Sequence, residues 1–282
     1  MTDSPVEAGV AEARPNGKLR APPRGGVRFA RGSFGVLLLL LAGEVFGRAG
    51  LVDRSYLPPT STVLAHVGGL VTSTGFLGDV AFTLVGWSSG LLIATVVAVP
   101  AGLLLGSRPM VNSAARVLVE FLRPIPAVAL IPLVLLFIAD QAEMERALAA
   151  YAATWPILMN TIYGAGDVDP EARDMARCFG LSRAAILFRV WLPSVAPVAA
   201  TGVRVASSVA LIVTVSTELI SGSGGNGLGQ FILDASGDPD GAADVFAAVA
   251  ITGALGLFLD GLLQYAGRKT LRWHFEQLGE AR

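Results

Sequence analysis

Four charged residues interrupt long apolar stretches of this sequence, at Arg123, Arg204, Glu218 and Asp260. A charge at the centre of a bilayer costs about 3 kcal/mol, so charges at such positions are candidates for attracting or excluding a charged molecule. For an anion, Arg204 would be the attracting group, and Glu218 would exclude other molecules. Two alternatives stay open, because Arg123 and Arg204 could extend to the nearer membrane surface and Glu218 could make a structural hydrogen bond. Each interpretation requires membrane-spanning elements to hold these side chains.

The composition is that of a membrane protein. The 282 residues are 53% hydrophobic and only 15% charged, whereas soluble domains carry roughly a quarter charged residues. The net charge of -1 gives no reason to expect a nucleic-acid partner. A single cysteine, Cys178, excludes an intramolecular disulfide, and only two histidines argue against a zinc site.

Apolar stretches of about 20 residues, the length that an α-helix needs to cross a core of roughly 30 Å, recur along the chain. We therefore predict an all-α, polytopic membrane protein with about six transmembrane helices, in which Arg123, Arg204 and Glu218 belong to a candidate translocation path. The first stretch carries Glu44, but no small-x-small cleavage site follows it, so we interpret it as a span rather than a signal peptide. The predicted spans cover residues 31–52, 80–106, 117–139, 147–165, 196–219 and 243–266.

Proline and glycine mark breaks within this pattern. Pro124, Pro126 and Pro132 are expected to kink the third span, because proline removes a helical hydrogen bond. Residues 222–227 match the dinucleotide-binding pattern G-x-G-x-x-G, but they follow a membrane helix and no strand precedes them. We interpret them as a turn that allows residues 228–233 to form a short re-entrant or interfacial helix.

The basic residues predict the orientation. Most of the 21 Lys and Arg residues lie in the two terminal segments and in the loops after the second and fourth spans, whereas the loop after the fifth span carries acids and no base. This asymmetry places both termini in the cytoplasm. The predicted segments are a disordered cytoplasmic tail over 1–26, a first span with an external interfacial helix over 27–79, a membrane core over 80–268 with a loop at 166–195, and a cytoplasmic tail over 269–282.

The loop at 166–195 carries signals for two short helices. Asp169 can cap a helix whose first residue is Pro170, and Gly180 can end that helix in a left-handed conformation. Ser182 can cap a second helix that runs to about residue 190, and Pro193 marks the return to the membrane. The first helix carries an apolar stripe of small residues, which suits a protein groove better than acyl chains; a helix lying on lipid head groups is the alternative. The stripe consists of Ala172, Met175, Ala176 and Phe179.

The loop resembles the signature of binding-protein-dependent ABC importer permeases, which reads E-A-A, three residues, G, nine residues, I-x-L-P. Here the matching residues are Asp174-Met175-Ala176, Gly180 and Val190-Trp191-Leu192-Pro193. Three of them differ from the signature: Asp174 replaces Glu, Met175 replaces the first Ala, and Val190 replaces Ile. Four other stretches are similar to the branch that imports sulfonates, taurine or nitrate, although Ile138-Ala139-Asp140 replaces a glycine-rich turn that is frequent there. These stretches are Leu57-Pro58-Pro59-Thr60, Leu122-Arg123-Pro124-Ile125-Pro126, Pro156-Ile157-Leu158-Met159-Asn160-Thr161 and Gly227-Leu228-Gly229.

The resemblance implies a permease subunit in a bacterial inner membrane, surrounded by lipid and paired with a second copy or a homologous permease. An external binding protein would deliver a small solute, expected to be an organic or inorganic anion. ATP and Mg²⁺ would bind to separate cytoplasmic ATPase subunits, so this chain is expected to bind no cofactor or metal and to be no enzyme; neither Lys18 nor Lys269 lies in a phosphate-binding motif. An ion-coupled secondary transporter, or a permease for another small nutrient, is the alternative. The residues that would couple the loop to the ATPase are Asp174, Met175, Ala176, Phe179, Gly180, Leu181, Val190, Leu192 and Pro193.

Overall fold

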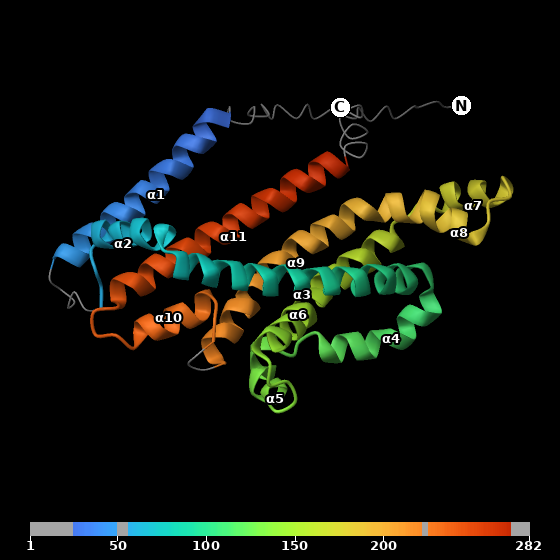
Figure 1. Ribbon diagram of the computed structural model, residues 1–282. Helices are drawn as coiled ribbons and strands as arrows, with labels where there is room; N and C mark the ends of the chain where they lie inside the picture. The colour runs from blue at the N-terminus through green and yellow to red at the C-terminus, as the bar shows by residue number, and fades with distance from the viewer. Residues whose placement is uncertain (1–24, 50–55, 222–224, 272–282) are drawn as a thin grey trace, which may run out of the picture.

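The computed structural model describes residues 25–49, 56–221 and 225–271, which form helices joined by turns (Figure 1). No strand occurs in these ranges, so the predicted all-α class is confirmed. The predicted tails over 1–26 and 269–282 fall almost wholly outside the described residues. The helices are α1 (Gly25–Arg48), α2 (Thr60–Thr72), α3 (Thr74–Ser107), α4 (Pro109–Leu122), η1 (Ala127–Leu130), α5 (Ile131–Leu135), α6 (Gln141–Gly166), α7 (Pro170–Cys178), α8 (Arg183–Ile186), η2 (Leu187–Trp191), α9 (Leu192–Ile220), α10 (Leu228–Ser236) and α11 (Ala242–Thr270).

Three of the described helices are long and apolar enough to cross a bilayer: α3, α11, and the continuous helix formed by α8, η2 and α9. The helices α4 and α5 add a fourth span if they are taken together, and they meet at a bend of 74°. This bend lies between Leu122 and Ala127, where Pro124 and Pro126 interrupt the helix, as the sequence predicts.

Helix α6 forms the centre of the bundle, because it packs along α3 on one side and along α9 on the other. Small residues allow this close approach: a Cβ added at Gly90 of α3 would lie 2.6 Å from the Cβ of Ala149, and one added at Gly202 of α9 would lie 2.8 Å from the Cβ of Asn160. The helix is rich in buried alanine. Most of the surface of α6 therefore contacts other helices and not lipid. This explains why its sequence is less apolar than that of α3 or α11.

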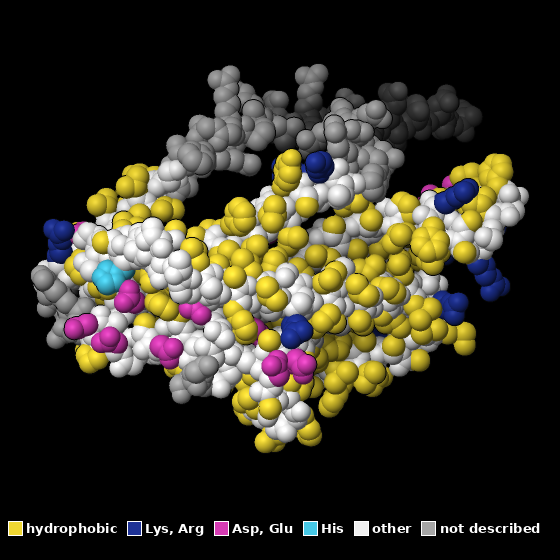
Figure 2. Space-filling view, in the orientation of Figure 1, with side chains coloured by type: hydrophobic (Ala, Val, Ile, Leu, Met, Phe, Trp, Pro, Cys, Tyr) yellow, Lys and Arg dark blue, Asp and Glu magenta, His cyan; other side chains and the backbone are white. Residues whose placement is uncertain are grey.

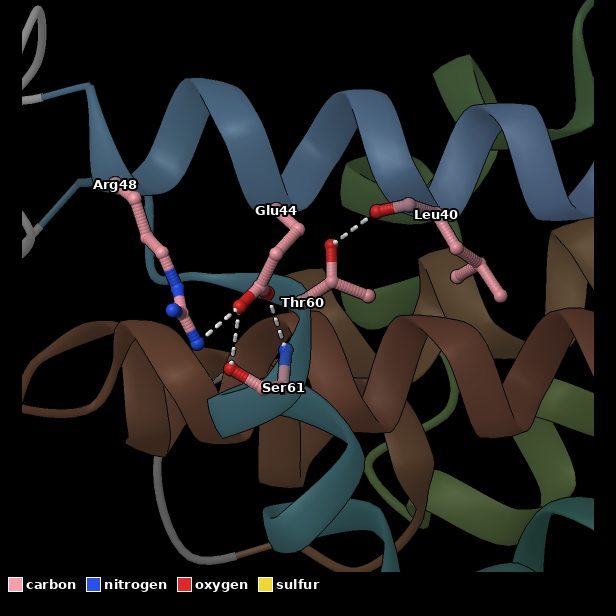
Figure 3. Close-up of polar contacts among 5 residues, drawn as sticks. All are labelled: Leu40, Glu44, Arg48, Thr60 and Ser61. Carbon is pink, nitrogen blue, oxygen red and sulfur yellow. Dashed lines mark hydrogen bonds and ion pairs between the residues drawn. The ribbon is translucent and has the colours of Figure 1, made fainter.

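Glu44, the charge within the first predicted span, links α1 to α2 (Figure 3). Its carboxylate accepts hydrogen bonds from the backbone N–H of Ser61 at 2.8 Å and from the Ser61 hydroxyl at 3.0 Å, and it pairs with Arg48 at 2.6 Å. The Thr60 hydroxyl donates to the carbonyl oxygen of Leu40 at 3.1 Å. Glu44 thus supplies an acceptor to the first turn of α2, which confirms the predicted short helix after Pro58-Pro59.

The bundle has two distinct ends. The helices α7 and α8 lie at one end, beside the junction of α3 and α4, and α2 and α10 lie at the opposite end (Figure 1). On the face drawn in Figure 2, acidic side chains gather toward the end that carries α2 and α10, and basic side chains occur around α7 and α8. The charge asymmetry of the sequence is therefore also an asymmetry in space.

Candidate functional site

The helix α7 is closed at both ends by its own residues. The Asp169 carboxylate accepts the backbone N–H of Glu171 at 2.8 Å, and Pro170 occupies the first helical position. Gly180 has a φ of 73°, its N–H donates to Arg177 O at 2.9 Å, and the N–H of Leu181 donates to Ala176 O at 3.1 Å. These two bonds form the Schellman motif that ends many helices. The predicted start and end of this helix are confirmed.

The apolar stripe of α7 divides between two faces. Met175 and Phe179 are 58% and 82% exposed, whereas Ala176 is 8% exposed and packs with Ile186 and Trp191. The structure therefore differs from the single outward stripe that the sequence suggested. In this chain Ala176 holds α7 against the bundle, and only Met175 and Phe179 present large apolar groups outward.

The second half of the loop is one helix with α9. Ser182 caps α8 by accepting the Ala185 N–H at 3.2 Å, as predicted. The helix then continues through the π-helical turn η2 directly into α9, and Pro193 lies in the first turn of α9. The prediction that the helix ends near residue 190 and that Pro193 begins a separate return is wrong. A proline lacks the N–H for the normal i to i-4 bond, and a π-turn is one way for a helix to accommodate this.

Trp191 is buried, and the partly buried side chains of Leu181 and Val190 pack against the core cluster to which it belongs. The guanidinium of Arg173 lies over the indole ring, 5.9 Å from its centroid. This distance is within the range of a cation–π contact. Asp174, the acid of the signature, pairs with Arg177 at 3.1 Å on the exposed side of α7. Val190 is half-buried, and Leu192 is partly exposed.

Arg204 is held by an acid on a neighbouring helix. Its Nε and Nη2 donate to the two carboxylate oxygens of Asp260 on α11, at 2.5 and 2.7 Å. Such a two-bond pair is the strongest geometry available to arginine and carboxylate. Within this chain both carboxylate oxygens of Asp260 therefore occupy the Arg204 guanidinium.

Arg123 lies at the edge of a cavity of about 490 Å³ between the bent third span, α6 and α9. Tyr151, Trp155 and Asn160 also line this cavity. The indole Nε1 of Trp155 is buried and has no hydrogen-bond partner among the described residues. A cavity with a guanidinium at its wall offers donors suited to an anion.

Glu218 is fully buried in a polar cluster at the end of the bundle opposite α7. Its carboxylate accepts the Thr83 hydroxyl at 2.7 Å and the backbone N–H of Gly229 at 2.8 Å. The Thr83 oxygen accepts the N–H of Leu228 at 3.0 Å, and the carboxylate of Asp79 accepts the N–H of Gly227 at 3.1 Å. The cluster thus binds the N–H groups at the start of α10 to α3 and α9, and the short helix predicted after the glycine-rich turn is confirmed.

Sequence reasoning missed Glu145, which is also fully buried and lies beside Gly86. Neither oxygen of its carboxyl group has a hydrogen-bond partner among the described residues. Buried carboxyl groups without donors are rare in proteins. The signal was available, since Glu145 lies only two residues before the predicted fourth span.

Known proteins show which family has this arrangement. The family described as "Binding-protein-dependent transport system inner membrane component" matches residues 98–272. The bicarbonate transport system permease protein CmpB of Synechocystis sp. is 28% identical over an alignment of 245 residues, which covers 82% of this chain and 85% of the relative. The nitrate import permease protein NrtB of Synechococcus elongatus is 26% identical over 224 residues, 79% of each chain.

A solved structure has the same fold. The inward-facing MetNI methionine ABC transporter superposes with a TM-score of 0.54 at 19% sequence identity, covering 76% of this chain and 97% of that chain. At this identity the likeness concerns the fold alone. The family match spans more than half of the sequence and contains the whole loop at 166–195. The chain therefore belongs to the binding-protein-dependent transport system inner membrane components, as the signature in that loop predicts.

Proposed function

We propose that this chain is the membrane-spanning permease subunit of an ATP-driven importer in a bacterial inner membrane, with both termini in the cytoplasm. The observation that carries the proposal is α7, a short helix with its own caps that lies at one end of the bundle (Figure 1). Its Met175 and Phe179 side chains are exposed. Exposed methionine and phenylalanine on a rigid helix fit an apolar groove of a partner protein. That partner is a cytoplasmic ATPase, which binds ATP and Mg²⁺.

The transported solute is a small anion, such as nitrate, bicarbonate, a sulfonate or taurine. The names of two relatives concern bicarbonate and nitrate, and the cavity beside Arg123 offers a guanidinium. Arg123 is a better candidate for contact with the anion than Arg204, because Asp260 occupies the Arg204 guanidinium. An external binding protein delivers the solute, and a second permease copy completes the path.

The docking role of α7 can be tested by co-purification. The double variant Met175→Ala/Phe179→Ala should insert into the membrane and fold, because neither side chain is buried, but should lose the co-expressed ATPase. The matched control is Met110→Ala, which removes another exposed methionine at the start of α4. Equal recovery of the ATPase with all three proteins would refute the docking role.

Transport itself separates this proposal from an ion-coupled transporter. Proteoliposomes that contain the chain, its ATPase and its binding protein should take up nitrate, bicarbonate or taurine only when ATP is present on the ATPase side. Arg123→Gln should reduce that uptake while leaving ATPase assembly intact, because Arg123 does not lie in the α7 loop. Uptake driven by an ion gradient in the absence of ATP would contradict the proposal.

A further inference from the structure

A cavity of about 1050 Å³ lies between the end of α3 and the segment from α7 to η2. We call it the arginine groove. Its floor is apolar and its rim is basic, and it lies at the end of the bundle where basic side chains occur in Figure 2. The floor includes Val99, Leu103, Ile186 and Trp191, and the rim includes Arg108, Arg173, Arg177 and Arg183.

The basic rim has little neutralising charge of its own. Among the described residues, only Arg177 of the four arginines forms an ion pair, with Asp174. The Nε of Arg173 is buried and has no hydrogen-bond partner among the described residues. The guanidinium of Arg173 is instead held over the Trp191 ring. The groove therefore holds a guanidinium that lies over an aromatic ring, beside the positive charges of Arg108 and Arg183, which form no ion pair among the described residues.

The floor of the groove continues onto the outer surface of α3. Leu92, Val96, Pro100 and Leu104 are all exposed and recur every four residues, so they form one stripe along the helix. Pro100 and Leu104 also line the groove. The stripe is about 18 Å long at 1.5 Å per residue. This length is close to half of a hydrocarbon core of roughly 30 Å, which is the depth of one leaflet.

We propose that the arginine groove binds one anionic phospholipid. The phosphate contacts Arg108, Arg173 and Arg183, and an acyl chain follows the stripe on α3 toward Leu92. A free phosphate would leave the apolar floor uncovered, and an acidic segment of a partner protein would not account for a stripe that runs one leaflet deep along a membrane span. The positive charge of the rim and the length of the apolar stripe together therefore favour a lipid over a free phosphate or an acidic protein segment.

Binding can be measured with the purified, delipidated full-length chain in detergent. Phosphatidylglycerol with brominated acyl chains should quench Trp191 fluorescence at lower concentration than brominated phosphatidylcholine, and Trp191→Phe should remove the quenched component. Inorganic phosphate should compete poorly. Equal quenching by both lipids, or competition by phosphate as effective as by lipid, would overturn the proposal, the latter in favour of a simple anion site.

Matched variants assign the charges. Arg183→Gln should weaken phosphatidylglycerol binding about fivefold, and Arg173→Gln/Arg183→Gln about thirtyfold, because each basic residue near an anionic head group contributes roughly that factor. Arg189→Gln removes an exposed arginine of the same loop that does not line the groove, and should leave binding unchanged. Native mass spectrometry of retained lipid gives a readout independent of the Trp191 environment. Equal lipid retention by all variants would refute the site, and loss of the lipid on adding the ATPase would assign the groove to the protein interface instead.

Discussion

Replacing Glu218 by leucine should loosen α10 from the end of the bundle. The substitution removes the acceptor of the Gly229 N–H, which lies 2.8 Å from the carboxylate. The Thr83 hydroxyl can still donate to Asp79 O at 3.1 Å, and its oxygen still accepts the Leu228 N–H. One buried N–H is therefore left without a partner, which costs about 2 kcal/mol. For a chain of this size, that cost lowers the apparent Tm by about 4–8 °C.

Glu218→Gln is the control for this experiment. The amide oxygen can accept the Gly229 N–H, and the NH₂ group can donate to the Thr83 oxygen, so the apparent Tm should change by less than about 2 °C. Thermal unfolding in one detergent compares the variants, and hydrogen–deuterium exchange over residues 228–236 reports the local effect. Identical melting of the leucine and glutamine variants, or unchanged exchange over α10, would show that the polar cluster does not hold this helix.

Two further predictions concern the end of α7 and the ion pair between α9 and α11. Gly180→Ala should lower the free energy of unfolding by about 1 kcal/mol through backbone strain alone, since φ is 73° and no atom lies within 4 Å of the added Cβ. Asparagine tolerates this conformation better, so Gly180→Asn should lower the free energy of unfolding by less in the same thermal assay. Arg204→Leu and Asp260→Leu should each destabilise the chain more than the double variant does, because each single change leaves an unpaired charge beside lipid. Additive losses in a double-mutant cycle would mean that the ion pair contributes nothing.

The loop helix could be predicted because its signals are local. A capping aspartate, a proline at the first position and a glycine at the end act within one turn of the residues that they affect. The direction that each side chain faces was harder to predict. Ala176 and Met175 are neighbours on the predicted stripe, but packing against Trp191 buries the first and leaves the second exposed. That choice depends on where the rest of the chain lies.

The polar cluster around Glu218 could not be predicted for the same reason. Thr83 and Glu218 are separated by 135 residues, and no periodicity in one helix indicates which residue of another helix it will contact. The sequence did identify Glu218 and the turn before α10 as separate features. Their connection through Asp79 and Thr83 is a property of the packed bundle alone.

The continuity of α8, η2 and α9 joins the two ends of the bundle. Helix α9 contains 29 residues and is therefore about 43 Å long, with the α7 loop at one end and Glu218 at the other. A packed helix of this length moves largely as one body, because its buried residues, such as Ala206, share a close-packed core with residues of α6, such as Ala149. Two points are exceptions: the π-turn at η2, whose hydrogen-bond pattern is irregular and which Pro193 follows, and Pro197 inside α9, which lacks the N–H of a helical hydrogen bond. If docking of the ATPase displaces α7, the helix can bend at η2 or at Pro197 inside α9. Motion that these two points do not absorb reaches the polar cluster that holds α10.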